Sequence, residues 1–223
     1  MTETTTGAEP PSTTDAIGST LATVDWRRTT FDLYRRVREA PDPEAAHALW
    51  CAGRDALFAT HAASPLLPED VAAFTTLPVA SYDPRWRFTV PIEPAAAAHL
   101  DVPTGTDGVV TFDRIGVVAI PGVGSLDVWA HGGYGGGVFL PIKDASAGTA
   151  RGTYGGGRYL LDTIKGADLG GDDGSLVVDF NFAYNPSCAY DPAWACPLAP
   201  AGNTVDVAIP VGEQYESFRR ELP

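Results

Sequence analysis

A segment in the last quarter of the chain carries most of the residue types that could do chemistry. It runs over residues 179–190 and closes at Cys196, and it combines a carboxylate, two amides, two tyrosines and two of the three cysteines. A carboxylate can accept a proton, and amide and phenol groups can fix the orientation of a polar ligand. The segment therefore predicts a polar binding site, without naming a reaction.

A second segment, 153–159, places an arginine and two tyrosines beside three consecutive glycines. The planar guanidinium of arginine matches carboxylate or phosphate groups. We expect Arg158 to bind a small anionic ligand and Asp179 to orient that ligand or accept a proton from it. Asp179, Arg158 and Tyr154 are therefore the catalytic candidates. The alternative is that Arg158 forms an internal ion pair with Asp179 or Asp144, because a buried arginine needs an acidic partner.

Together the two segments predict one pocket, which binds a small anionic metabolite; whether it also converts that metabolite stays open. Its expected lining shares polar or polarisable side chains: Tyr154, Arg158, Asp179, Asn181, Tyr184, Asn185, Cys188 and Tyr190. A non-catalytic alternative remains open. In that case the same polar cluster is an internal hydrogen-bond network that sets strand register and anchors the loop ending at Cys196.

The spacing of the cysteines argues against a metal site. Seven residues separate Cys188 from Cys196, whereas paired ligands of structural zinc sites are usually two to four residues apart. No metal ligand set is expected. Two packed thiols are the leading interpretation, and a disulfide or a metal-bound pair stays open.

The pattern of residues 177–184 is typical of a strand, since aromatic and β-branched residues dominate it. Side chains alternate between the two faces of a strand. Asp179 and Asn181 are therefore expected on one polar face, and Phe180 and Phe182 on the opposite, core-facing side.

The wider chain predicts an α+β fold that is mainly β. Strands are expected at 87–93, 109–112, 115–121, 126–130, 138–142, 158–161, 176–184 and 205–209. Short connections between about eight strands favour antiparallel pairing in a barrel or sandwich. A flavin-binding split barrel is a further alternative, suggested by strand count alone; otherwise the cofactor is unknown.

Helices are expected only near the start of the folded part, within residues 25–75. Asp25 can cap a first helix, and Asp42 followed by Pro43 is a strong start signal for a second. A short turn of helix is expected after Pro68. These helices would cover one end or face of the β-domain.

Composition limits the classes of partner. The chain has 223 residues and a net charge of −13, with no basic patch, so neither nucleic acid nor an anionic membrane is an expected partner. Residues 1–24 are polar and are expected to form a disordered leader before one domain at 25–223. They lack the basic and apolar parts of a secretory signal, so a cytoplasmic protein is expected. Nothing in the composition predicts an oligomeric state.

Several strings of the sequence resemble a known family. These are FLPIKD at 139–144, TYGGGRYL at 153–160, DFNFAYNPSCAY at 179–190 and CPL at 196–198. They resemble the bacterial and archaeal family catalogued as domain of unknown function 1684, over roughly the last three quarters of the chain. Lys143 and Arg151 depart from the residues usual in that family, an arginine and an acid. The resemblance implies no activity.

Overall fold

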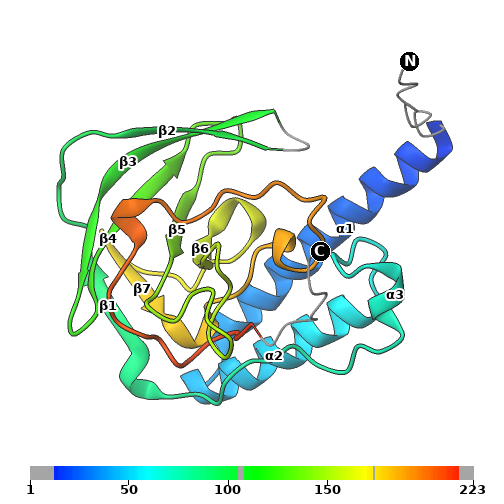
Figure 1. Cartoon of the computed structure of the whole chain (residues 1–223), viewed down its shortest axis with the longest axis horizontal. Helices are drawn as coiled ribbons and strands as arrows, with labels where there is room; N and C mark the ends of the chain where they lie inside the picture. Colours follow the sequence, from blue (N-terminus) through cyan, green and yellow to red (C-terminus); the bar gives the residue numbers. More distant parts are fainter. Residues whose placement is uncertain (1–12, 105–107, 173, 216–223) are drawn as a thin grey trace, which may run out of the picture.

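Two antiparallel sheets and two long helices make up the fold (Figure 1). The computed structural model describes residues 13–104, 108–172 and 174–215. The helices are α1 (Thr13–Glu39), α2 (Pro43–Thr60) and the short α3 (Pro68–Val71). The strands are β1 (Arg87–Pro91), β2 (His99–Pro103), β3 (Val109–Ile120), β4 (Gly124–His131), β5 (Val138–Ile142), β6 (Arg158–Asp162) and β7 (Ser175–Asp179).

The larger sheet has the order β2-β3-β4-β5-β6, and β1 pairs with β7 in a second sheet. Every strand pair is antiparallel, as predicted. A single bridge between Glu93 and Val117 connects the segment after β1 to β3. The sheets do not close into a barrel, so the α+β class is confirmed but the barrel is not.

The start of α2 is confirmed. The Asp42 carboxylate accepts a hydrogen bond of 2.8 Å from the Ala45 backbone N–H, and Pro43 occupies the first turn. Trp50 on α2 is fully buried, and its indole Nε1 donates to the Tyr34 hydroxyl of α1 at 3.0 Å. This bond and the packing around it fix the two helices against each other.

The start of α1 differs from the prediction. The helix begins at Thr13 rather than at Asp25, so residues 13–24, expected to be disordered, are helical. Residues 1–12 of the expected leader lie outside the described part of the chain. Figure 1 shows the first turns of α1 extending away from the sheets. Polar residues there face solvent and do not interrupt the backbone hydrogen bonds of the helix, which is why composition alone was misleading.

Several strand predictions need correction. The two expected strands at 109–112 and 115–121 form one strand, β3, whose register with β4 shifts between Arg114 and Gly116. At that point the chain after β1 approaches closely, because a Cβ on Gly116 would lie 2.5 Å from the Glu93 carbonyl oxygen. Strand β2 was not predicted. The expected strand at 205–209 does not form; the residue just before it, Thr204, makes an isolated parallel bridge with Lys143.

The strand expected over 176–184 ends at Asp179 and continues as a 3-10 helix, Phe180–Phe182. Asp179 causes this turn, since its carboxylate accepts a 3.0 Å hydrogen bond from the Asn181 N–H. Asn181 and Phe182 are both fully buried. The predicted alternation between a polar and an aromatic face is therefore wrong beyond Asp179.

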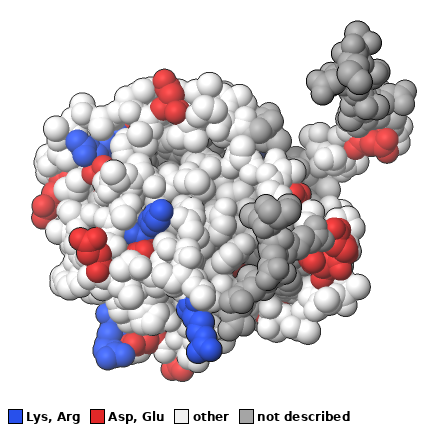
Figure 2. All heavy atoms as spheres, viewed as in Figure 1, with Lys and Arg blue, Asp and Glu red and all other residues white. Residues whose placement is uncertain are grey.

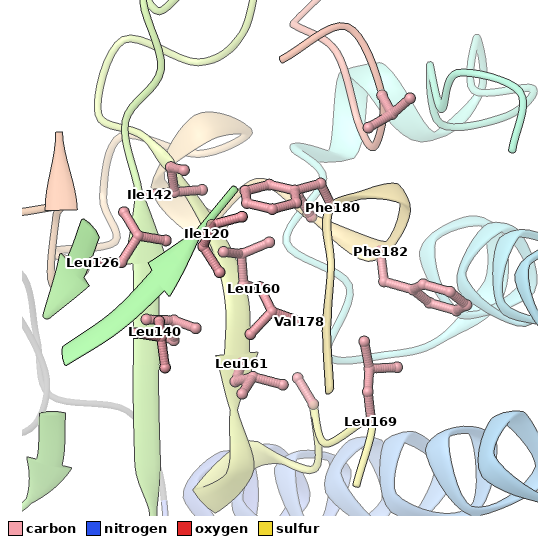
Figure 3. Packing of buried hydrophobic residues seen from close by; sticks show 14 of the residues in the cluster. Ile120, Leu126, Leu140, Ile142, Leu160, Leu161, Leu169, Val178, Phe180 and Phe182 are labelled. Carbon is pink, nitrogen blue, oxygen red and sulfur yellow. The ribbon is translucent and has the colours of Figure 1, made fainter. Parts of the chain in front are cut away.

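One apolar core connects the two sheets and the helices. Figure 3 shows Leu140 of β5, Leu160 of β6, Val178 of β7 and Phe180 gathered in one cluster. Each of these side chains is essentially removed from solvent. Among the described residues, no helix combines the length and apolarity needed to cross a lipid bilayer. Charged side chains lie scattered over the face shown in Figure 2, and the residues coloured there form no basic patch.

Candidate functional site

A cavity of about 110 Å³ lies between α1, α2, the end of β6 and the segment after the 3-10 helix. That volume is of the order of a cavity that holds benzene. Six aromatic rings form much of its wall: Trp26, Tyr34, Phe58, Tyr159, Tyr184 and Tyr190. The remaining lining residues are Thr30, Leu33, Arg54, Leu57, Pro65, Asp162, Lys165, Ala167, Asn185, Pro186, Ser187 and Cys196.

The cavity reaches the molecular surface along one edge. Lys165 is exposed there, and Trp26, Thr30 and Ser187 are partly exposed. The opposite wall is closed, because Tyr34 and Leu57 are buried. A small molecule can therefore enter at the Lys165 edge and be enclosed by the helices and by β6.

Asn185 contributes an acceptor that no described donor satisfies. Its Nδ2 donates to the Gln214 carbonyl oxygen at 3.2 Å, which sets the orientation of the amide because a carbonyl can only accept. Its backbone N–H donates to Glu213 Oε2 at 3.1 Å. Oδ1 has no hydrogen-bond partner among the described residues, although Asn185 is only 4% exposed. Buried acceptors without partners are uncommon and call for an explanation.

Arg54 is held in a buried ion pair. Its Nη1 donates to Glu213 Oε2 at 2.8 Å, and the same carboxylate accepts a hydrogen bond from the Tyr190 hydroxyl. The Arg54 guanidinium lies 4.7 Å from the Trp50 ring centroid and 5.2 Å from that of Tyr184. Burial lowers the pKa of Arg54, but its neighbours, Glu213 foremost, raise the pKa by more, so the net shift is upward. Arg54 therefore stays charged, and its charge is balanced by Glu213.

Asp162 is the second carboxylate at the cavity. It stands at the end of β6, and its side chain is 6% exposed. Its paired cation, Lys165, places Nζ 3.6 Å from Oδ2, which is longer than a hydrogen bond. Burial raises the pKa of Asp162, and Lys165 offsets part of that rise. Lys165 is thus the cation that pairs with this carboxylate among the described residues, and it does so loosely.

The tyrosines of the wall remain protonated at neutral pH. Burial raises the pKa of Tyr34 to about 12 and raises the pKa of Tyr184 well above its ordinary value. The Tyr159 hydroxyl donates a hydrogen bond of 2.6 Å to the Pro197 carbonyl oxygen. These side chains offer ring faces and hydroxyl groups to a ligand, and no nucleophilic phenolate.

Arg158 does not lie in this cavity. Its Nη2 donates to Asp144 Oδ2 at 3.1 Å, and its guanidinium also binds the carbonyl oxygens of Ile209, Val211 and Glu213. The side chain is fully buried. The prediction that Arg158 binds an anion is therefore corrected: the internal ion pair with Asp144, given as its alternative, is what forms.

Asp179 and Asn181 lie together but away from Arg158. Asn181 Nδ2 donates to Asp179 Oδ1 at 2.8 Å, and Arg87 Nη1 lies 3.0 Å from Asp179 Oδ2. Asn181 also exchanges hydrogen bonds with the backbone of Asp83. Both side chains are fully buried and neither lines the cavity, so this pair holds the start of β1 against the end of β7.

Tyr154 and Cys188 form a further contact behind the cavity wall. The Tyr154 hydroxyl lies 3.6 Å from Cys188 Sγ. A hydrogen bond with the Cys196 sulfur lowers the pKa of Cys188 to about 6; burial opposes this shift and Tyr154 contributes to it. Cys188, Cys196 and the third cysteine, Cys51, are all free thiols. Of this group only Cys196 lines the cavity.

The structure thus brings Tyr184, Asn185 and Tyr190 of the predicted pocket to the cavity and leaves the other five members outside the lining. The sequence interpretation missed Arg54 and Asp162. A signal was present for Arg54, because it follows Trp50 by four residues on the core-facing side of α2, where a charge needs a partner. Asp162 ends a buried strand, which gave a weaker signal.

Comparisons with known proteins cover the part of the chain that holds the seven described strands. A family model described as "Protein of unknown function (DUF1684)" matches residues 72–214. The match includes Asp162, Asn185 and Glu213 and stops short of α1 and α2, which supply the other half of the cavity wall. No curated protein matches the chain.

The chain is also similar to a solved structure, the solution NMR structure of the uncharacterized protein from gene locus rrnAC0354 of Haloarcula marismortui. The sequences are 29% identical, and the similarity covers 73% of this chain and 89% of that chain. The TM-score is 0.52. This similarity supports the fold.

Proposed function

The chain belongs to the DUF1684 family of proteins of unknown function, and we propose that it binds a small molecule in the cavity between its two long helices and strand β6. One observation carries this proposal. Asn185 presents a buried carbonyl oxygen that receives no hydrogen bond from any described group. An acceptor left in that state costs about 1–3 kcal/mol, and a ligand that enters the cavity can satisfy it once the Asn185 side chain turns toward the cavity.

The composition of the wall supports the same proposal. Ligand sites are commonly apolar and aromatic with a few placed polar groups. Here the rings of Tyr34 and Tyr184 stand beside three polar side chains, Arg54, Asp162 and Asn185. The candidates named for catalysis, Asp179, Arg158 and Tyr154, do not line the cavity, so the proposal is binding and assigns no reaction.

The sequence analysis offered two alternatives, an internal hydrogen-bond network and a flavin-binding split barrel, and the contacts support only the first. Arg158, Asp144, Asp179 and Asn181 do form internal hydrogen-bond networks, which supports a structural role for most of the predicted polar cluster. The flavin alternative rested on strand count alone, and no contact among the described residues adds support to it, so it is not part of this proposal. We therefore assign stability to the networks and ligand binding to the separate cavity.

A small molecule is the only partner included in this proposal. The net charge of −13 supports the expectation that nucleic acid is not a partner. The cytoplasmic location belongs to the same proposal, and cell fractionation checks it.

The proposal is tested by screening compounds of six to twelve heavy atoms by protein-observed NMR. We expect hits to shift the backbone amides of Thr30, Ala167 and Ser187 more than amides of β2 and β3. Ser187→Trp should abolish these hits by filling the cavity. Ser125→Trp adds the same ring on the exposed side of β4 and should leave them intact. A screen whose hits never reach the lining amides would refute the proposal.

A further inference from the structure

The polar groups of the cavity differ in whether they already have a hydrogen-bond donor or a counter-charge. Among the described residues, the Asn185 carbonyl oxygen has no donor, and the Asp162 carboxylate pairs loosely with Lys165, whose Nζ lies 3.6 Å from Oδ2. The positive charge of Arg54, in contrast, is already matched by Glu213 at 2.8 Å. The wall therefore has an unsatisfied acceptor and a loosely paired carboxylate, whereas its buried cation is already balanced.

The aromatic rings favour the same kind of ligand. The face of an aromatic ring attracts a cation within about 6 Å of its centroid. Arg54 already lies over Tyr184 at 5.2 Å, which shows that a cation is stable beside this wall when a carboxylate accompanies it. Tyr34 and Tyr159 present further rings to the cavity near Asp162.

The existing partner of Asp162 can be displaced. The Lys165 side chain is 53% exposed and its Nζ lies 3.6 Å from the carboxylate. Water screens the exposed Lys165 end of this pair, so the pair holds the lysine weakly. Lys165 can therefore turn toward solvent at the cavity edge when another cation takes its place.

Resting on the proposed function above, we propose that the ligand is a small organic amine, whose ammonium group is bound by the Asp162 carboxylate and the Asn185 carbonyl oxygen between the aromatic rings. This replaces the anionic ligand predicted from Arg158, which is bound internally by Asp144. An ammonium offers N–H donors and a positive charge, which suit the Asp162 carboxylate and the Asn185 carbonyl oxygen. The net charge of −13 also favours the approach of a cation.

Three ligands of nearly equal shape test the inference on the intact chain: benzylamine, benzyl alcohol and benzoate. Binding is measured by NMR titration of the lining amides at neutral pH. We expect benzylamine to bind about tenfold more tightly than the other two, which is typical of one charge-assisted hydrogen bond. The preference is defined as the ratio of the benzylamine and benzoate association constants.

Two charge changes should move this preference in opposite directions. Asp162→Asn should lower it about tenfold, and Lys165→Gln should raise it. Asp168→Asn removes a carboxylate outside the lining and should leave the preference unchanged. A merely structural effect would change the affinity for all three ligands alike, and circular dichroism confirms that each variant is folded.

The outcomes separate the two proposals. If benzoate or benzyl alcohol binds at the lining amides as tightly as benzylamine, the amine inference is overturned and small-molecule binding stands. The inference is also overturned if other compounds reach the lining amides and benzylamine does not. If no compound reaches them, the proposed function fails and the inference fails with it.

Discussion

Arg158 Nη2 lies 3.1 Å from Asp144 Oδ2, and both side chains are almost completely removed from solvent. Thr153 also donates to Asp144 Oδ2, at 2.7 Å, so the carboxylate binds both the glycine-rich turn and β6. The guanidinium in turn donates to the carbonyl oxygens of the C-terminal stretch, including Val211 at 2.6 Å. This ion pair therefore ties three distant parts of the chain to one point in the core.

Breaking that pair should destabilise the fold. Asp144→Ala leaves the Arg158 charge buried without a carboxylate, so we expect the free energy of unfolding to fall by about 3–5 kcal/mol. Urea denaturation followed by circular dichroism measures it. Asp113→Ala is the control, because Asp113 pairs with His99 on the surface and its loss should cost less than about 1 kcal/mol. Equal losses in the two variants would contradict the assignment.

The contribution of Asp162 to the free energy of unfolding should fall as pH rises, whereas that of a carboxylate with a lowered pKa would grow. Its folded pKa is raised by burial, so the unfolded chain loses the proton first and stability falls as pH rises from 3.8 through the folded pKa. Asp162→Asn cannot lose a proton. The variant should therefore match the parent near pH 3 and equal or exceed its stability at pH 7. Chemical denaturation at several pH values measures this difference, and a variant that becomes relatively weaker as pH rises would contradict it.

Cys188 should be the most reactive of the three thiols. Its pKa is lowered to about 6 by the hydrogen bond with Cys196, whereas burial raises the pKa of Cys51 to about 11. Since the thiolate is the nucleophile, iodoacetamide at pH 7 should modify Cys188 more than about tenfold faster than Cys51. Peptide mass spectrometry over time gives both rates.

The control for that experiment is Tyr154→Phe, which removes the hydroxyl 3.6 Å from Cys188 Sγ. The rate at Cys188 should then fall at pH 6–7, while the rate at Cys51 should stay the same. Faster modification of Cys51 than of Cys188 in the parent protein would show that the thiol pair does not form.

Two glycines with the same backbone angle separate strain from crowding. Gly212 and Gly122 both have φ of 75°, a conformation that is strained for other residues. A Cβ on Gly212 would lie 2.6 Å from the Phe180 carbonyl oxygen, whereas a Cβ on Gly122 meets nothing within 4 Å. Gly122→Ala should cost about 1 kcal/mol. Gly212→Ala should cost more, because the crowding adds to the strain, and thermal unfolding compares the two. Similar costs would mean that the approach to Phe180 is relaxed easily.

Local signals in the sequence predicted those elements whose causes lie within a few residues. Asp42 and Pro43 marked the start of α2, and the bounds of β5, 138–142, agree with the structure. The antiparallel arrangement and the family resemblance were also readable, since both depend on strings of neighbouring residues. The same kind of reasoning failed at Asp179, where one carboxylate turns the expected strand into a 3-10 helix.

The candidate site was decided by contacts between distant residues. Arg54 and Glu213 are 159 residues apart, and Asn181 reaches the backbone of Asp83 across 98 residues. Sequence showed that Arg158 needed an acidic partner, and only the tertiary structure selected Asp144 over Asp179. The physical reason is that a buried charge requires a counter-charge, but its position in space is set by how helices and sheets pack. The sequence alone therefore determined where α2 and β5 lie and which side chains could do chemistry. Tertiary packing decided which of those side chains face a cavity.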